Sequence, residues 1–338
     1  MPGLLLDTLK GKRAEKVPMW LMRQAGRYLP EYRALRAEKG GFLDLVYDSE
    51  AAAEVTIQPI DRFGFDGAIL FSDILIVPHA MGQDLEFLAG EGPKLSPRLL
   101  DAELGGFRPR PERFEAVYQT VRLCRRRLPE SVTMLGFAGS PWTVATYMVA
   151  GEGSRDQHDT RALAYTDPAR FQSIVDAIAD QTIDYLRGQI DAGAEAVQLF
   201  DSWAGSLAPD EFERWVIAPN AAIVAAVKET HPDTPVIGFP KGAGAKLPAY
   251  ARETGVDAIG VDETQDPHWV HRHVPEGMPV QGNLDPLLLL AGGERLKARC
   301  RTILEAFSER PHVFNLGHGI GQHTPIAHVE ELVAAVRG

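Results

Sequence analysis

Two arginines close an apolar segment near the amino terminus. Arg23 and Arg27 stand four positions apart in WLMRQAGRYLPEYR, and no acidic residue precedes Glu31 in this stretch to pair with them. Guanidinium groups bind carboxylates through paired hydrogen bonds and stay charged at any working pH. Arg23 and Arg27 therefore predict a site for an anionic ligand, whereas Arg33 and Arg36 also fit a solvated basic surface.

A carboxylate and a histidine stand out further along the chain. Asp73 lies between ILFS and ILIV, where an ionised side chain is costly unless a partner compensates for the lost water. It therefore either faces a ligand or serves as a structural cap or ion-pair partner. His318 lies in NLGHGIG and either belongs to a site or bonds the backbone of its loop. The run HWVHRH (268–273) has no cysteine or carboxylate set nearby, so it predicts a surface helix rather than a metal site.

The glycine-rich stretches do not match known nucleotide or nucleophile motifs. GHGIG (317–321) departs from the dinucleotide pattern GxGxxG, and KGAGAK (241–246) lacks the ending of a phosphate-binding loop. GSPWT (139–143) does not have the form GxSxG of a serine hydrolase. The sequence therefore gives no signal for nucleotide, flavin or serine-hydrolase chemistry.

Short apolar runs alternate with longer amphipathic segments, and this alternation predicts a parallel sheet covered by helices. The predicted strands are residues 18–22, 67–71, 132–137, 196–200, 235–239, 257–261, 279–282 and 312–316. The predicted helices are residues 50–62 (capped by Ser49), 111–128, 168–192, 209–229, 293–307 and 325–336. Eight such strands favour a closed (β/α)8 TIM-type barrel, with an open doubly wound sheet as the alternative. Residues 82–110 and 151–166 read as irregular insertions near one rim.

Polar or small residues follow every predicted strand. In chain order they are Arg23, Ser72-Asp73, Gly139-Ser140-Pro141-Trp142, Asp201-Ser202, Lys241, Asp262, Asn283 and His318. In a (β/α)8 barrel the carboxyl ends of the strands meet at one face, and this face carries the chemistry. The sequence therefore predicts that these side chains surround a ligand.

Composition and charge narrow the class of protein. The chain has 338 residues, of which 45% are hydrophobic and 24% charged, and its net charge is −11. This charge argues against nucleic acid or an anionic membrane surface as the main partner, but not against a small anionic ligand in a local basic pocket. The amino-terminal apolar run is too short for a signal peptide, and the aliphatic run at 287–291 is too short to span a bilayer. Cys124 and Cys300 lie in helical patterns and predict plain thiols, so a cytoplasmic protein is expected.

Two long motifs resemble those of a known protein family. PMWLMRQAGRYLPEYR and GFAGSPWTVATYMVAGEGS (136–154) resemble the two signatures of the uroporphyrinogen decarboxylase family. The resemblance extends over the whole chain, because FSDILIVP (71–78), QLFDSWAGSLAP (198–209), QGNLDP (281–286) and NLGHGI (315–320) follow in the family's order.

The resemblance implies a single domain over residues 1–338, a (β/α)8 barrel with a deep cleft at the carboxyl ends of the strands, and a homodimer. It implies conversion of uroporphyrinogen III to coproporphyrinogen III in haem-type tetrapyrrole synthesis, in which four acetate side chains become methyl groups and four CO₂ are released. It implies that no metal and no organic cofactor takes part.

The resemblance also implies which residues contact the substrate. They are Arg23, Gln24, Ala25, Gly26, Arg27, Asp73, Tyr147, Ser202 and His318, with Asp73, Arg23 and Arg27 expected to be catalytic. The arginines would hold carboxylates on the macrocycle rim. Asp73, ionised by default with an ordinary pKa of about 4, would accept the central pyrrole N–H groups and stabilise positive charge on a protonated ring. The proton donor stays open between an arginine, His318, Tyr147 and a bound water.

Two other functions compete with this interpretation. A zinc-dependent, corrinoid-linked methyltransferase would share the fold, but it needs thiolate and histidine ligands at strand ends, where this chain has no cysteine. A non-catalytic tetrapyrrole-binding protein would need the basic residues but not the full set of polar side chains expected around the ligand.

Overall fold

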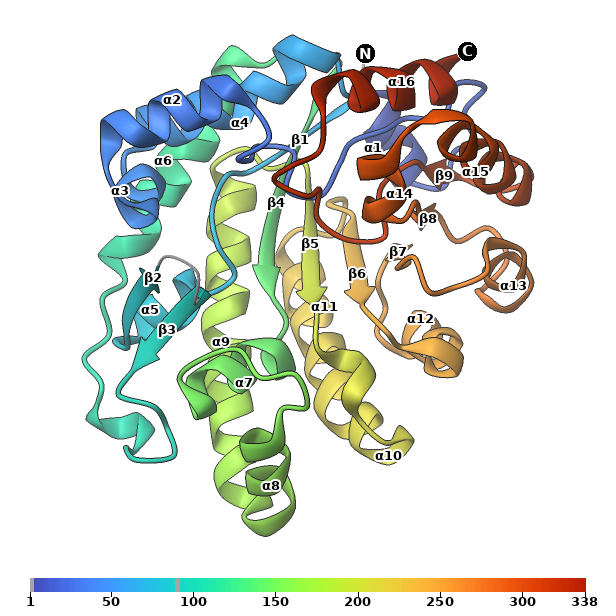
Figure 1. Ribbon diagram of the computed structural model, residues 1–338. Coiled ribbons are helices and arrows are strands. Elements are labelled where there is room, and N and C mark those ends of the chain that lie inside the picture. The colour runs from blue at the N-terminus through green and yellow to red at the C-terminus, as the bar shows by residue number, and fades with distance from the viewer. Residues whose placement is uncertain (1–2, 89–91) are drawn as a thin grey trace.

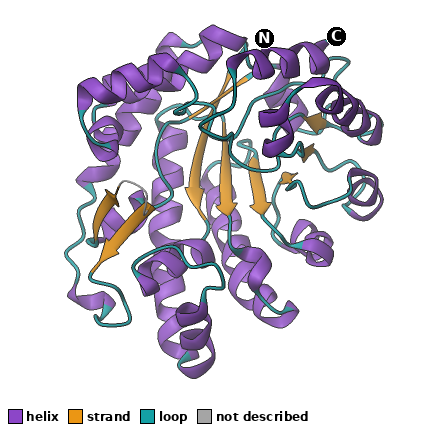
Figure 2. Ribbon diagram, in the orientation of Figure 1, coloured by secondary structure: helices purple, strands orange, loops and turns teal. Residues whose placement is uncertain are grey.

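A curled parallel sheet forms the centre of the molecule, with helices around it (Figures 1 and 2). The computed structural model describes residues 3–88 and 92–338. Neighbouring strands pair in the order β1-β4-β5-β6-β7-β8-β9. They are β1 (Gly67–Ile69), β4 (Thr133–Gly139), β5 (Ala196–Asp201), β6 (Val236–Pro240), β7 (Ala258–Gly260), β8 (Val280–Gln281) and β9 (His312–Val313). Each corresponds to one of the predicted strand runs.

The first predicted strand closes the sheet into a barrel. Residues 18–22 form only an isolated parallel bridge, between Met19 and Phe314. The Phe314 amide donates to the Pro18 carbonyl (2.8 Å) and the Trp20 amide to the Phe314 carbonyl (3.3 Å). On the other side the Asp66 amide, just before β1, donates to the Met19 carbonyl (2.9 Å). The segment thus occupies the eighth position between β9 and β1, and the fold is the predicted (β/α)8 barrel rather than an open sheet.

Side chains fill the inside of the barrel. Trp20 donates from its indole Nε1 to the Gln281 Oε1 (2.9 Å), and Gln281 Nε2 donates to the Gln198 Oε1 (3.0 Å). All three side chains are fully buried. This chain of bonds links the closing segment, β8 and β5, so the barrel is a packed core and not a pore.

Five of the six predicted helical segments are confirmed, and shorter helices are present as well. The long helices are α4 (Ser49–Phe63), α6 (Glu112–Arg127), α9 (Pro168–Asp191), α15 (Gly293–Ala306) and α16 (Ile326–Arg337). The shorter ones are α1 (Leu4–Leu9), α2 (Pro30–Lys39), α3 (Phe42–Tyr47), α5 (Ile76–Met81), α7 (Pro141–Ala150), α8 (His158–Thr166), α12 (Leu247–Glu253), α13 (Pro267–His273) and α14 (Pro286–Ala291). The HWVHRH run forms α13, as predicted. None of the helices in the described ranges is long and apolar enough to cross a bilayer.

Two helix predictions need correction. The cap of α4 is Asp48, whose carboxylate accepts from the Ala51 amide (3.1 Å), while the Ser49 hydroxyl donates to the Ala116 carbonyl (2.8 Å). The predicted helix at 209–229 is divided into α10 (Pro209–Phe212), a π-helical turn (Glu213–Ile217) and α11 (Ala218–Thr230). The π turn buries the consecutive residues Trp215, Val216 and Ile217. The 3.6-residue period of the sequence does not predict three buried residues in a row, so the break in the helix could not be seen from it.

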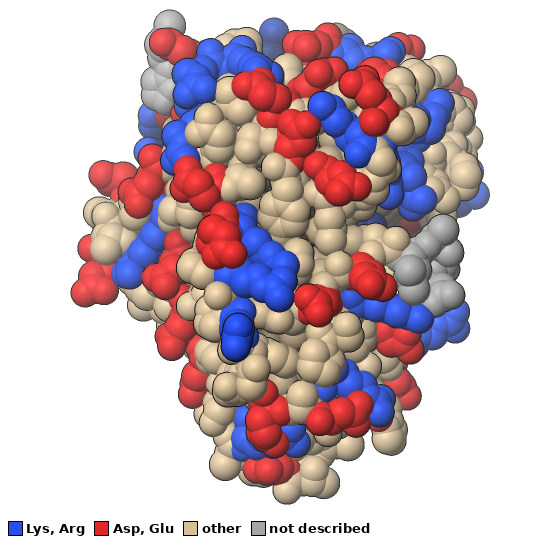
Figure 3. Space-filling view, turned by 90° about the vertical axis from the view of Figure 1, so that its left-hand side faces the viewer, with Lys and Arg blue, Asp and Glu red and all other residues tan. Residues whose placement is uncertain are grey.

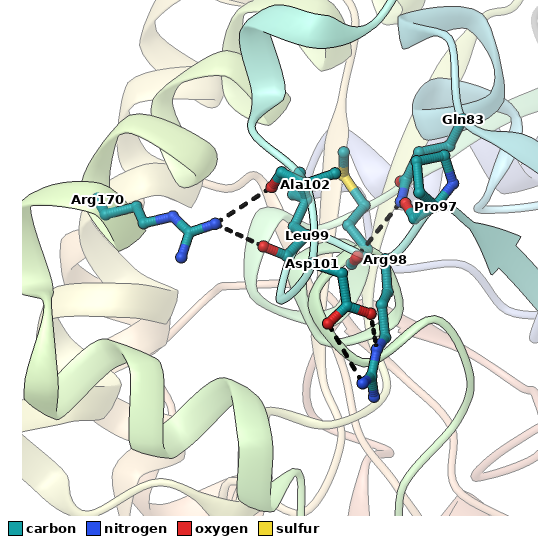
Figure 4. Close-up of polar contacts among 8 residues, drawn as sticks. Gln83, Pro97, Arg98, Leu99, Asp101, Ala102 and Arg170 are labelled. Carbon is teal, nitrogen blue, oxygen red and sulfur yellow. Dashed lines mark hydrogen bonds and ion pairs between the residues drawn. The ribbon is translucent and has the colours of Figure 1, made fainter.

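The predicted irregular insertions are also partly regular. Residues 82–110 contain the antiparallel hairpin β2 (Asp84–Leu88) and β3 (Gly92–Ser96), and residues 151–166 contain α8. Residues 89–91 lie outside the described part of the chain. Beyond the hairpin, Arg170 of α9 donates to the Leu99 carbonyl (2.6 Å) and the Ala102 carbonyl (3.1 Å), and Gln83 donates to the Pro97 carbonyl (2.9 Å; Figure 4). Side-chain bonds to backbone therefore hold this segment against the barrel.

Charges on the surface are mixed. On the face in Figure 3, acidic and basic side chains are interspersed, with a group of basic side chains near the middle. Both chain ends lie at the top of Figure 1, away from the end toward which the strand arrows point. Any chemistry at the carboxyl ends of the strands is thus distant from the termini.

Asn315 fastens the closing segment to the last strand. Its side chain is fully buried, and its Oδ1 accepts from the Met22 amide (3.0 Å) and the Leu316 amide (2.8 Å). The Ile320 amide then donates to the Met22 carbonyl (2.9 Å). One amide oxygen thus satisfies two buried donors at the point where the barrel closes.

Replacement of Asn315 by leucine removes this shared acceptor and keeps a side chain that is branched at the same carbon. Two buried N–H groups lose their partner, and we expect the free energy of unfolding to fall by about 2–6 kcal/mol. Urea unfolding followed by circular dichroism measures it. The exposed Gln322 offers the matched control, since Gln322→Leu should change stability by less than about 0.5 kcal/mol. Equal stability of the two variants would show that Asn315 does not support the closure.

Candidate active site

The predicted strand-end residues share one face of the barrel. Arg23 follows the closing segment, Asp73 follows β1, Ser202 follows β5, Lys241 follows β6 and His318 follows β9. Because all strands of the sheet are parallel, their carboxyl ends lie together. The structure therefore gathers these residues from segments far apart in the sequence.

Arg23 has an unusual backbone and an unpaired charge. Its φ is +61°, in the left-handed region that a residue with a Cβ adopts at a cost of roughly 1–2 kcal/mol. Its exposed side chain runs over Gly319, where an added Cβ would lie 2.4 Å from Arg23 Cδ. In the described part of the chain its guanidinium makes no ion pair, although its charge acts on Asp73, Tyr147 and His318.

Asp73 is held by its own loop and not by a strong counter-ion. Its Oδ1 accepts from the Leu75 amide (2.9 Å), two residues ahead. Burial raises the pKa of Asp73 to about 6, and the Leu75 N–H and the positive charge of Arg23 act in the opposite direction. The residue is thus a carboxylate at pH 7 whose second oxygen has no hydrogen-bond donor among the described residues.

His318 is an uncharged imidazole at neutral pH. Its ring stacks on Phe239 of β6, with centroids 6.3 Å apart and an interplanar angle of 26°. Burial lowers the pKa of His318 to about 3, and the nearby cations Lys241 and Arg23 lower it as well. A neutral ring at this place offers one N–H donor and one acceptor nitrogen instead of a positive charge.

Lys241 belongs to this group, although the family resemblance did not suggest it. Its charge acts on His318, and it makes no ion pair with a carboxylate in the described ranges. In the sequence, Lys241 could be recognised by its position just after a predicted strand. Arg23, Asp73, Ser202 and His318 hold the same kind of position. Two cations without a carboxylate partner among the described residues, Arg23 and Lys241, therefore stand at the strand ends of a protein whose net charge is −11.

Tyr147 lies near the same charges, on α7. Burial is the main cause that raises the pKa of Tyr147, and the negative charge of Asp73 raises it further. A hydrogen bond with Trp203 and the positive charge of Arg23 lower the pKa in part. The phenol is therefore protonated at neutral pH and able to donate a hydrogen bond. Ser202 is partly exposed, and its hydroxyl makes no hydrogen bond to any described residue.

The remaining predicted contacts come from the loop after the closing segment, and they differ from one another. Gln24 is fully buried: its Oε1 accepts from the Leu21 amide (3.0 Å) and its Nε2 donates to the Gly67 carbonyl (2.9 Å). Its side chain thus fixes the loop to the start of β1. Ala25 and Gly26 are partly exposed.

Arg27 is exposed, and in the described part of the chain its side chain forms no hydrogen bond or ion pair with Asp73 or His318. Its carbonyl accepts from Arg33 Nη1 (2.8 Å), which also reaches the Tyr28 carbonyl (3.4 Å). Arg33 thus stabilises the loop through hydrogen bonds to its backbone and is more than a surface charge. The charge of Arg23 thus acts on Asp73, Tyr147 and His318. The side chains of Arg27 and Ser202 form no hydrogen bond with these residues in the described part of the chain.

Comparison with known proteins identifies the family. The family model described as uroporphyrinogen decarboxylase (URO-D) matches residues 2–338. The chain belongs to the uroporphyrinogen decarboxylase family. A protein named uroporphyrinogen decarboxylase from Erythrobacter litoralis is 73% identical over 337 residues, which cover 100% of this chain and 99% of that one. One of the same name from Novosphingobium aromaticivorans is 70% identical, with 100% and 99% covered.

Solved structures support the fold of this uroporphyrinogen decarboxylase family member. A methyltransferase from Methanosarcina mazei has a TM-score of 0.82 at 20% identity, covering 98% of this chain and 96% of its own. A B12-independent methionine synthase from Shewanella sp. has a TM-score of 0.56 at 11% identity, covering 97% and 95%. At such identities the likeness concerns the fold alone.

The two cysteines lie away from the strand ends. Cys124 is in α6 and Cys300 in α15, both buried, and burial raises the pKa of each thiol to about 12. In the described ranges no three His, Cys, Asp or Glu side chains are grouped as a metal would need. The zinc-dependent alternative therefore gains no support from the position or charge state of the thiols.

Substitution of Gly319 by alanine tests the position of Arg23. The new Cβ would collide with Cδ of Arg23, and this exposed side chain can rotate away at little cost to folding. We expect kcat/KM to fall about 10- to 100-fold with the melting temperature unchanged. Gly321→Ala is the matched control, because its Cβ would lie 3.4 Å from Thr324 Oγ1. Similar activity of both variants would contradict a placed Arg23.

The raised pKa of Asp73 predicts an acidic limb in the pH profile. Above pH 6 the side chain is a carboxylate that accepts N–H groups, and below pH 6 it gains a proton and loses this ability. We expect kcat/KM, which reports the free enzyme, to fall as the pH is lowered through about 6. Asp73→Asn should lack this limb. A limb centred near pH 4 instead would show an unperturbed carboxylate.

Proposed function

We propose that this chain decarboxylates uroporphyrinogen III to coproporphyrinogen III in haem-type tetrapyrrole synthesis, turning four acetate side chains into methyl groups with loss of four CO₂. Full-length membership of the uroporphyrinogen decarboxylase family supports the reaction. One observation carries the assignment to this site: the Asp73 carboxylate, with an unpaired Arg23 close enough to affect its pKa, lies at the carboxyl ends of the strands. Residues 1–338 would form one catalytic domain with a deep cleft at this face.

The substrate supplies the charges that the site lacks. Uroporphyrinogen carries eight carboxylates around its rim and four pyrrole N–H donors at its centre. Arg23 and Arg27 would each bind a rim carboxylate through paired hydrogen bonds. Asp73 would accept the central N–H groups, and these donors would stabilise its ionised form further. A central anion and peripheral cations match the charge distribution of this macrocycle.

The reaction needs a place for the electrons of the breaking C–C bond. A pyrrole protonated on a ring carbon is itself an electron sink, so the substrate can perform this role without a cofactor. Protonation leaves the ring positively charged, and a fixed carboxylate near its centre stabilises that charge by several kcal/mol. We assign this role to Asp73.

Tyr147, Ser202 and His318 would orient the substrate. A protonated phenol, a free hydroxyl and a neutral imidazole are hydrogen-bond donors without a charge of their own. Because His318 is neutral, the enzyme without substrate has no imidazolium proton at this position. The negative charge of a bound substrate carboxylate would raise the pKa of His318. The backbone of Gln24, Ala25 and Gly26 would line the same side of the ligand.

The decisive assay uses reduced uroporphyrinogen III under anaerobic conditions with product separation by chromatography. Coproporphyrinogen is the expected product. Binding without turnover would favour the non-catalytic tetrapyrrole-binding protein. Neither binding nor turnover, together with stoichiometric zinc by elemental analysis, would favour the methyltransferase.

Substitutions at the site should separate the central anion from the rim. Asp73→Asn keeps the shape and removes the charge, so we expect kcat to fall about 100-fold or more. Arg27→Lys keeps the charge and removes the fork, so we expect KM to rise about 10-fold with a smaller effect on kcat. Arg13→Lys, in an exposed pair with Glu309, is the control. Near-normal turnover by Asp73→Asn would refute the role given to Asp73.

We also infer a cytoplasmic homodimer. Two unpaired, buried thiols fit a reducing compartment, and the resemblance to the family implies the dimer. Light scattering after gel filtration should give twice the 37.0 kDa mass of the chain. A single-chain mass across micromolar concentrations would exclude the dimer.

A further inference from the structure

A buried carboxyl group lies directly beside the proposed substrate contact Ser202. Asp201 is the last residue of β5 and is fully buried. Its Oδ1 accepts a hydrogen bond from the Thr143 hydroxyl (2.5 Å). Its Oδ2 is buried and has no hydrogen-bond partner, and no lysine or arginine of the described ranges forms an ion pair with it. The reaction scheme above does not use this group.

The surroundings favour the uncharged form of Asp201. An ionised carboxylate out of water needs several donors or a counter-ion, and here one hydroxyl is bonded to it. Burial accordingly raises the pKa of Asp201 to about 7, against the effects of Thr143 and Asn220. The titratable group facing it among the described residues is Tyr250 of α12, whose own hydroxyl is buried without a partner. Tyr250 is itself neutral, so no charge offsets a negative Asp201.

Thr143 connects this acid to two segments of the proposed site. While its hydroxyl donates to Asp201, it accepts from the Trp203 amide (3.1 Å), in the loop that carries Ser202. The Trp142 indole donates to the Trp203 carbonyl (3.1 Å) and secures the same peptide from its other side. Both Trp142 and Thr143 belong to α7, which carries Tyr147 about one turn further on. Ser202 and Tyr147 are thus placed by one shared set of bonds.

We propose that Asp201 is a positioning residue, which as an uncharged carboxylic acid fixes the Ser202 loop and the Tyr147 helix to one another through Thr143. It does not touch the substrate. This role rests on the proposed function, because Ser202 and Tyr147 matter only if they contact the tetrapyrrole. A lost link would let both donors shift, and displacements of about 1 Å can reduce catalysis about 100-fold.

Activity of four variants tests the link. Thr143→Val removes the hydroxyl, and we expect kcat/KM to fall about 10-fold or more. Thr143→Ser should restore most of it. Because part of the loss acts through Tyr147, Thr143→Val combined with Tyr147→Phe should lose clearly less activity than the sum of the two single losses. Fully additive losses, or an unaffected Thr143→Val enzyme, would overturn the proposal.

Asp201→Asn tests the charge state, since asparagine mimics the neutral acid. We expect kcat/KM within about 3-fold of the native enzyme near pH 6.5, whereas a loss of about 10-fold or more at that pH would show that a carboxylate is required and would overturn the proposal. With the folded-state pKa near 7 and the unfolded one near 4, folding of the native chain becomes less favourable as the pH rises between these values.

The melting temperature of Asp201→Asn minus that of the native chain should therefore increase from about pH 5 to about pH 8. A constant difference would contradict the uncharged acid. This thermal measurement needs no substrate, so it separates failure of the proposed function, seen as an inactive native chain, from failure of the Asp201 proposal.

Discussion

The hydrogen bonds that join the first and last barrel segments are the constraint on which the rest of the site depends. Pro18, Trp20 and Met22 bond to Phe314, Asn315 and Ile320, and these bonds close the barrel. The same bonds bring Arg23 against the loop of His318, with Gly319 leaving room for the arginine side chain. The amide of Asp66, just before β1, donates to the Met19 carbonyl and joins the closing segment to β1. Asp73 lies in the loop after β1. A defect in closure would therefore separate Arg23, Asp73 and His318 as well as destabilise the fold.

Charge at the mouth of the barrel is set by burial as much as by residue type. Arg23 and Lys241 remain cations without carboxylate partners in the described part of the chain. Burial lowers the pKa of His318, and these two charges lower it further. Burial brings the pKa of Asp73 to about 6, where the carboxylate still predominates at pH 7. An acidic protein thus places two cations, without carboxylate partners among the described residues, at the same barrel face as the Asp73 carboxylate. A polycarboxylate with central N–H donors would match the charges of Arg23 and Asp73 in the proposed function.

Buried polar side chains hold the site together without facing a ligand. Gln24 and Asn315 bond backbone amides at the closing segment, and Thr143 bonds the peptide of Trp203. Each leaves unsatisfied backbone groups in the core when it is replaced by an apolar residue, which makes such positions sensitive to substitution. Motif resemblance alone grouped Gln24 with the ligand residues, whereas its contacts indicate a support for the loop that carries Arg23 and Arg27.

The barrel, the order of its strands and the strand-end positions of Arg23, Asp73, Ser202 and His318 could be predicted from the sequence, because hydrophobic period and chain order are local properties. It missed the hairpin of β2 and β3, placed the α4 cap on Ser49 and made one helix of residues 209–229, since turn pairing, cap choice and the π turn depend on what packs nearby. The pKa shifts of Asp73, Asp201 and His318 and the nearness of Lys241 to His318 could not be predicted from the sequence. A pKa depends on burial and on charges from distant segments, and these are absent until the barrel has closed.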